Sequence, residues 1–286
     1  GPLLNPARIA ALLGRRDQLF AIAVVALSAK LAKCDGPVTR DMDVDVAVIG
    51  SGYTGLSTAI HLAKEHGVKA TVLEANGVAY GCSTRNGGQA QISAGRLKRS
   101  QWIDRWGLDV ARGLHNEMVE AFALFRGLLR DHDIQCDPQD GGHYYIAHKA
   151  GVMPTLEAEA KLLRDTFGYD ARMLSRDELF QTAVRDQEAQ GAMWEADGLG
   201  IHAAKLAFGY LRAARELGAT VHPDSPVQGW ELKNGVHHLR TPGGIVRARR
   251  VAVAELLKSG VTTICDLGQP REDWVDHYEE TGIRAV

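Results

Sequence analysis

One stretch of the sequence, residues 44–74, constrains the fold of this chain more than any other. It begins with Val44–Ile49, a run rich in β-branched residues that is typical of a strand buried in a parallel sheet. Gly50, Gly52 and Gly55 follow at the spacing G-x-G-x-x-G. A strand that leads directly into such a turn predicts the strand–turn–helix unit of an α/β fold.

A helix and a second strand are predicted to complete this unit. Apolar side chains recur at helical spacing through Leu56–His66, and Gly67 then ends the helix. Val68–Leu73 is predicted to be the second strand, with Glu74 at its end. The sequence therefore predicts a Rossmann-like α/β domain built on a parallel sheet.

The three glycines and the acid each suit the binding of a dinucleotide. Gly50 permits the tight turn, Gly52 lets the backbone approach a pyrophosphate, and Gly55 lets helix and strand pack closely. The helix N-terminus offers free N–H groups and the positive end of its dipole to the phosphates. Glu74 can accept hydrogen bonds from ribose hydroxyls, and its charge would repel the 2′-phosphate of NADP. The alternative is an ordinary βαβ unit with a glycine-rich turn; the complete order of elements favours the dinucleotide.

A polar, glycine-rich segment, Gly81–Gln89, follows soon after the second strand. A segment with so many small residues can wrap closely around a ligand, although it can also be a plain surface connection. The specific run Arg85–Gln89 favours binding.

These segments resemble a known family. Residues 46–57, 73–75 and 83–89 are similar to those of the FAD-dependent amine and amino-acid oxidases of the D-amino-acid oxidase superfamily, with the γ-glutamylputrescine oxidases as the nearest branch. That family usually has small residues where Ser83 and Thr84 stand. The resemblance implies FAD rather than NAD as the cofactor, with the 83–89 loop beside the pyrophosphate and the flavin ring.

The motif and the resemblance together predict a set of cofactor-binding residues. The family places a backbone contact to the adenine at the residue that matches Val227. The predicted set is Gly50, Ser51, Gly52, Tyr53, Thr54, Gly55, Glu74, Ala75, Ser83, Thr84, Arg85, Asn86, Gly87, Gly88, Gln89 and Val227.

An inserted α+β region, residues 100–200, is predicted to face the substrate. Its main element is a helix over 107–130, whose apolar stripe is expected to be core. A strand over 141–147 carries His143, Tyr144 and Tyr145, which could lie over a flavin but are more often structural. The further predicted elements are a helix over 156–167, a helix capped by Ser175 and Glu178, a helix over 203–217, a strand over 219–222, a hairpin at Asn234–Gly235 and a parallel strand over 246–254.

Two flanking fragments are predicted, so the chain divides into 1–42, 43–254 and 255–286. Residues 1–42 are predicted to be helical and resemble part of a TerB-like domain. Their apolar run Leu19–Ala29 could be the h-region of a signal peptide, but a buried helix is favoured. Residues 255–286 resemble a piece of the metal-dependent amidohydrolases and are expected to contribute nothing to the flavin site.

Composition excludes several kinds of partner and site. The 286 residues have a formal net charge of −2, so neither nucleic acid nor a membrane is an expected partner. Four scattered cysteines indicate neither a zinc site nor a disulfide framework and fit a reducing, cytoplasmic compartment. No metal is expected, since His237 and His238 are adjacent on a predicted strand and point to opposite faces.

The resemblance implies oxidation of a C–N bond in a small-molecule amine or amino acid. The substrate carbon would give a hydride to the flavin, water would hydrolyse the resulting imine, and oxygen would reoxidise the flavin to give hydrogen peroxide. The sequence names no catalytic acid or base. Two alternatives stay open: a catalytically inactive, truncated or chimeric FAD-binding module, and a helical interaction protein that uses residues 1–41 and has an inert tail.

Overall fold

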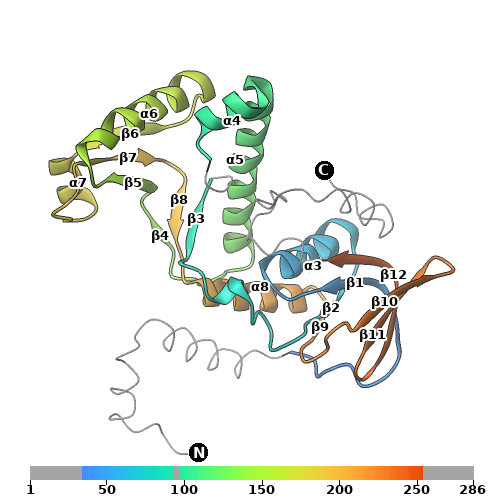
Figure 1. The fold of residues 1–286 in the computed structure, drawn as a ribbon. Coiled ribbons are helices and arrows are strands. Elements are labelled where there is room, and N and C mark those ends of the chain that lie inside the picture. The colour runs from blue at the N-terminus through green and yellow to red at the C-terminus, as the bar shows by residue number, and fades with distance from the viewer. Residues whose placement is uncertain (1–33, 93–96, 254–286) are drawn as a thin grey trace, which may run out of the picture. The chain divides into compact units, whose positions relative to one another are not determined.

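The computed structural model describes residues 34–92 and 97–253, which fall into two compact units (Figure 1). Unit 1 comprises 34–87, 134–136 and 202–253 of the described residues, and unit 2 comprises the rest. The predicted N-terminal helices, the apolar run Leu19–Ala29 and the fragment 255–286 lie outside the described residues. The described part of the chain contains no helix long and apolar enough to cross a membrane.

Unit 1 is built on a six-stranded sheet with the order β10-β11-β12-β1-β2-β9. Four neighbouring strands, β12, β1, β2 and β9, run parallel, whereas β10, β11 and β12 form an antiparallel meander. The strands are β1 Met42–Ile49, β2 Thr71–Leu73, β9 Thr220–His222, β10 Gly229–Lys233, β11 Val236–Thr241 and β12 Gly244–Val253. The predicted α/β fold with a parallel sheet is thereby confirmed.

Two helices of unit 1, α3 (Tyr53–His66) and α8 (Ala203–Glu216), pack against each other, and α3 also packs on β1, β2 and β12. Gly67 ends α3 with φ 65°, in the left-handed region, and its N–H donates to the carbonyl of Ala63. The predicted strand over Val68–Leu73 is wrong at its start. The N–H of Val68 donates to Leu62 O and completes the helix cap, so pairing begins only at Thr71.

The predicted hairpin at Asn234–Gly235 is confirmed. Asn234 and Gly235 have φ values of 51° and 77°, and they join β10 to β11. Positive φ at both turn residues is the requirement of a type I′ turn, whose twist matches that of the strands it connects. The next strand, β12, returns to the sheet as predicted and pairs parallel with β1, with Val253 opposite Ile49.

The described N-terminal segment, 34–41, has no helix and belongs to unit 1. Asp35 exchanges hydrogen bonds with Val221 of β9: its N–H donates to Val221 O, and its carboxylate accepts from Val221 N at 2.8 Å. Arg215 of α8 approaches the same carboxylate at 3.2 Å. Hydrogen bonds from Val221 and Arg215 hold the pKa of Asp35 below its usual value, against the effect of burial.

Unit 2 contains two three-stranded antiparallel sheets, ordered β3-β8-β4 and β5-β7-β6. Its strands are β3 Gln89–Gln91, β4 Gln139–Asp140, β5 His143–Ala147, β6 Ala171–Ser175, β7 Gly191–Glu195 and β8 Gly198–Gly200. Its helices are α4 Arg99–Trp106, α5 Leu108–Asp131, α6 Met153–Phe167 and α7 Arg176–Thr182. The predicted long helix is α5, and the capping box of α7 forms as expected, with Ser175 N donating to Glu178 Oε2 at 2.7 Å.

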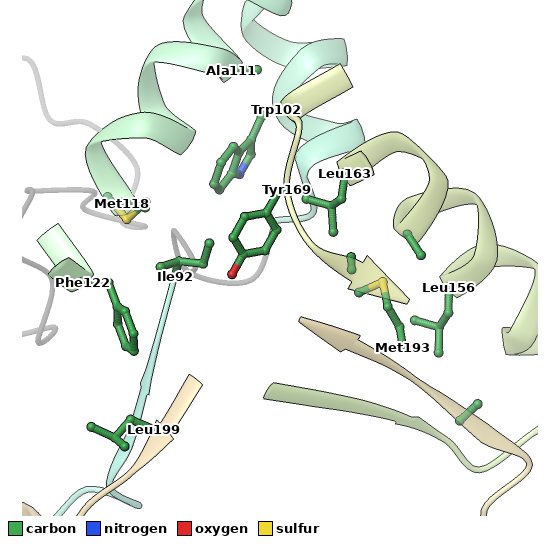
Figure 2. Packing of buried hydrophobic residues seen from close by; sticks show 13 residues of the cluster. Ile92, Trp102, Ala111, Met118, Phe122, Leu156, Leu163, Tyr169, Met193 and Leu199 are labelled. Atoms are coloured by element: carbon green, nitrogen blue, oxygen red, sulfur yellow. The ribbon is translucent and has the colours of Figure 1, made fainter. Parts of the chain in front are cut away.

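The core of unit 2 is an aromatic and aliphatic cluster (Figure 2). Met118 and Phe122 of the α5 stripe are buried, and Trp102 of α4 is fully buried with them. Helix α4 was not predicted. Gly107, with φ 83°, separates α4 from α5. The residue predicted to begin the long helix is therefore the junction between two helices.

Candidate functional site

The glycine-rich turn of unit 1 connects β1, which ends at Ile49, to α3, which begins at Tyr53. Gly50 has φ 96°, a conformation that favours glycine, and its N–H donates to the carbonyl of Leu73 at 2.8 Å. Gly52 is the N-cap of α3, and as a glycine it has no side chain with which to cap the helix. The first turn of α3 contains no acidic residue. The turn therefore leaves the positive end of α3 able to receive an anion.

Ser83 explains why residue 52 is glycine. The first N–H of α3, that of Tyr53, donates to Ser83 Oγ at 3.0 Å. A Cβ added to Gly52 would lie 3.0 Å from the same oxygen, which is tighter than nine in ten real Cβ contacts. The short turn Cys82–Thr84 is thus held against the start of α3, and a side chain at residue 52 would force Ser83 to shift.

Glu74 lies beside this turn, at the end of β2. Its Oε2 accepts two hydrogen bonds from Ser51, from the backbone N at 2.9 Å and from Oγ at 2.7 Å. Its Oε1 accepts one hydrogen bond from Asn76 N at 3.0 Å. The carboxylate is only partly buried, so the acid predicted from the motif is both fixed in place and open to solvent.

The segment after β2 is held by its own side chains. Thr84 Oγ1 donates to Ala79 O at 2.8 Å, and Asn86 Nδ2 donates to the carbonyls of Cys82 and Ser83 at 3.1 and 3.2 Å. The guanidinium of Arg85 lies 4.1 Å above the ring of Tyr80. These contacts hold residues 79–86 together, and the hydrogen bond from Ala79 N to Ser51 Oγ at 2.8 Å attaches the segment to the glycine-rich turn.

Tyr53 links α3 to α8. Its hydroxyl donates to Ala203 O at 2.7 Å, and its ring meets that of Tyr210 edge-on, with centroids 6.0 Å apart. Burial raises the pKa of Tyr53 to about 12, so the phenol stays protonated near neutrality and keeps this hydrogen bond. The side chain of Tyr53 therefore serves the packing of the two helices, while its backbone N–H belongs to the turn.

Val227 lies two residues after Ser225, whose N–H holds the backbone of Glu74. Ser225 N donates to Glu74 O at 2.8 Å, and Val227 packs, half-buried, against the cluster that includes Leu73 and Val246. Ala75 is exposed immediately after Glu74. The structure thus brings Val227 and Ala75 to the region where the acid is held, and their contact with the cofactor stays a prediction.

Gly88 and Gln89 belong to unit 2, unlike the other predicted residues. Gln89 pairs with Gly200 in the β3–β8 ladder, and Gly88 O accepts from Ile201 N at 2.8 Å. Gly88 has φ 69°, and a Cβ there would lie 1.9 Å from Ile201 O. These contacts give both residues a structural role within unit 2.

Unit 2 contains a buried group of charged side chains that was not predicted from the sequence. The guanidinium of Arg99 lies 3.5 Å from both carboxylate oxygens of Glu195, and Arg99 N donates to Glu159 Oε1 at 2.7 Å. All three side chains are buried. His143 and Tyr145, singled out above, border this cluster: burial and then Arg99 lower the pKa of His143, and burial raises the pKa of Tyr145. Only three-dimensional packing brings these residues together, so no local pattern reveals the cluster.

His115 of α5 should make the stability of unit 2 depend on pH. It is buried against the rings of Phe167 and Tyr169, and burial lowers its pKa from 6.5 to about 4, with a smaller effect from Arg99. Because the folded state resists the proton that the unfolded state accepts, the stabilisation is complete above pH 6.5 and is lost as pH falls towards 4.

We expect the wild type to lose about 2 kcal/mol more stability between pH 7 and pH 5 than His115→Leu does. Urea denaturation at the two pH values measures this difference. Equal losses in both proteins would show that His115 is protonated as easily in the folded state as in the unfolded one.

The described ranges contain no group of three or more His, Cys, Asp or Glu side chains placed to hold a metal ion. His237 accepts a hydrogen bond at Nδ1 from Trp230 Nε1 at 3.0 Å and is therefore engaged in the β10–β11 meander.

Several known proteins are similar to this chain in sequence or in fold. The DAO family of FAD-dependent oxidoreductases matches residues 45–262. The gamma-glutamylputrescine oxidoreductase of Escherichia coli K12 is 34% identical over 221 residues, covering 76% of this chain and 50% of that protein. A sarcosine oxidase subunit beta from an Arthrobacter species is 27% identical over 222 residues, covering 73% and 50%. The crystal structure of a glycine oxidase from Geobacillus kaustophilus matches with a TM-score of 0.60 at 23% identity, covering 74% of this chain and 55% of that one.

The chain spans about half the length of the curated relatives that it matches. The family match extends past residue 254, into the fragment that resembles an amidohydrolase; that fragment and the boundary before it stay predictions. The likeness to the glycine oxidase shows a shared fold, and the family match covers both the glycine-rich turn and the acid at the end of β2. This chain belongs to the DAO family of FAD-dependent oxidoreductases.

Proposed function

We propose that the glycine-rich turn of unit 1 binds the adenosine diphosphate moiety of FAD. The bound FAD would oxidise a C–N bond in a small amine or amino acid. The proposal rests on three features that lie together: the Gly50 turn, the α3 N-terminus, whose first turn contains no acidic residue, and Glu74, which is fixed beside them. The names of the relatives, which include a gamma-glutamylputrescine oxidoreductase and a sarcosine oxidase subunit, support an amine or amino acid as the substrate.

The donor set of the turn suits a pyrophosphate. Gly52 has extended backbone angles that any residue can adopt, so its lack of a side chain reflects close packing and not backbone strain. The dipole of α3, a helix of 14 residues, places partial positive charge at this end. Phosphate oxygens could therefore approach the backbone N–H groups of the first turn, where Thr54 and Gly55 lie.

The carboxylate of Glu74 suits a ribose. Each carboxylate oxygen offers about two acceptor positions. Ser51 occupies both positions of Oε2, and Asn76 N occupies one position of Oε1, so one position of Oε1 is left for a ligand hydroxyl. A free ribose hydroxyl can donate to it, whereas a 2′-phosphate would meet like charge, which again disfavours NADP.

The residues of unit 1 would bind and orient the cofactor, which supplies the chemistry. FAD, when bound, accepts the hydride that leaves the substrate carbon as its C–N bond is oxidised. Tyr53, protonated near neutrality, keeps α3 attached to α8, and Ser83 keeps the 82–84 turn against the start of α3. Activity on an amine or amino acid, a cytoplasmic location and the absence of nucleic-acid partners are parts of this proposal.

Replacing Gly52 by valine should abolish FAD binding. The new Cβ would displace Ser83 Oγ from its bond to the Tyr53 N–H, and the two methyl groups would cover the first turn of α3. Flavin retained after purification, read from the visible absorption spectrum and from titration with FAD, measures the loss.

Gly81→Val is the matched control for this substitution. Gly81 also has extended backbone angles, and a Cβ there would meet nothing within 4 Å. The control should bind FAD as the wild type does. Stoichiometric flavin in folded Gly52→Val would show that the pyrophosphate lies elsewhere.

A further inference from the structure

Ser51 occupies a variable position of the glycine motif, yet its side chain is completely buried. A residue at this position could be expected to face the ligand or the solvent. The burial of Ser51 means that its hydroxyl acts on the protein itself, and its partners identify that action.

The one proton of the Ser51 hydroxyl is used inside the protein. The hydroxyl donates it to Glu74 Oε2 at 2.7 Å and accepts from Ala79 N at 2.8 Å. The backbone N–H of Ser51 donates to the same Oε2 at 2.9 Å. Ser51 therefore has no proton to offer to a phosphate, and both of its donors serve the carboxylate of Glu74.

These bonds fix the orientation of the carboxylate. With Oε2 held by Ser51, the other oxygen, Oε1, accepts from Asn76 N. The backbone of Glu74 is fixed as well, because its N–H donates to His222 O at 3.0 Å and its carbonyl accepts from Ser225 N. The long side chain is thus held in one conformation before any ligand binds.

We infer that Ser51 is a positioning residue for nucleotide recognition: it orients Glu74 so that Oε1 alone accepts from one ribose hydroxyl of the adenosine moiety. The inference rests on the proposed function, because it requires an adenosine diphosphate group at the turn. It adds that the preference for a ribose over a deoxyribose depends on Ser51, which does not itself touch the nucleotide.

The test measures discrimination and not affinity alone. The full chain, freed of flavin, is titrated with ADP, 2′-deoxy-ADP and 3′-deoxy-ADP. The wild type should bind ADP at least about tenfold more tightly than the analogue that lacks the hydroxyl bonded to Glu74, since a hydrogen bond to a charged group is lost. In Ser51→Ala this ratio should fall to about threefold or less, and in Glu74→Ala to about one.

Ser83→Ala is the control, because Ser83 binds the Tyr53 N–H on the other side of the turn. It should weaken the binding of ADP and of its deoxy analogues by the same factor and leave the ratio unchanged. Because Ser51 acts through Glu74, adding Ser51→Ala to Glu74→Ala should not change the ratio of ADP affinity to deoxy-ADP affinity any further. Ser51→Cys, which keeps the volume but offers a weak donor, replaces the alanine variant if that variant does not fold.

The outcomes separate this inference from the proposed function. If the wild type does not bind ADP, the proposed function fails. If the wild type binds ADP with discrimination and Ser51→Ala or Ser51→Cys keeps the full ratio, the site stands and the role of Ser51 is overturned. Binding of ADP without preference over either deoxy analogue would also overturn it.

Discussion

Replacing Gly88 by alanine should lower the free energy of unfolding by about 3 kcal/mol. Gly88 has φ 69°, a left-handed conformation that is unfavourable for alanine, and the added Cβ would lie 1.9 Å from Ile201 O. That carbonyl belongs to the backbone beside the β3–β8 ladder, and Ile201 N donates to Gly88 O, so relief requires breaking the local pairing. Urea denaturation followed by tryptophan fluorescence measures the loss.

The neighbouring glycine provides the control for this prediction. A Cβ on Gly87 would meet nothing within 4 Å, and its φ lies outside the left-handed region. Gly87→Ala should therefore leave the unfolding midpoint nearly unchanged. Equal midpoints for the two variants would contradict the placement of Gly88 against Ile201.

Replacing Arg99 by alanine should cost about 3–5 kcal/mol of stability. Arg99 and Glu195 are each about 3% exposed, so the substitution leaves the buried carboxylate of Glu195 without its cation. Burial already raises the pKa of Glu195, and Arg99 is the group that opposes that rise. The penalty comes mainly from the buried charge left unpaired and less from the loss of the ion pair itself.

Two comparisons test this explanation. Arg130→Ala removes an arginine that is 78% exposed and pairs with Asp131 on the surface, and it should have little effect. Adding Glu195→Gln to Arg99→Ala removes one unpaired charge and should restore part of the lost stability. A double variant no more stable than Arg99→Ala would show that lost packing, and not charge, causes the destabilisation.

The elements that sequence analysis predicted correctly are those with strong local signals. The strand β1, the helices α5 and α8 and the hairpin at Asn234–Gly235 follow from short-range patterns of apolar residues and turn residues. The start of β2 was misplaced because Val68 caps α3, a choice between two hydrogen-bonding patterns that composition alone does not decide.

The features that were missed depend on residues far apart in the chain. Helix α4 begins at Arg99, which is separated by 60 positions from Glu159 and by 96 from Glu195. A charged residue at that position is typical of a solvent-exposed site, and only these distant partners explain its burial. Ser51 was predicted as a cofactor-binding residue, but its bonds to Glu74 and Ala79 could not be predicted, because they require β1 and β2 to be side by side.

Titration of the flavin-free chain with FAD, in the presence and absence of ADP, tests the central claim most directly. The arrangement of the Gly50 turn, the α3 N-terminus and Glu74 predicts one saturable FAD site per chain and competition by ADP, because the adenosine diphosphate moiety provides the contacts to unit 1. FAD binding that ADP does not displace, or a folded chain that binds no FAD, would contradict the account.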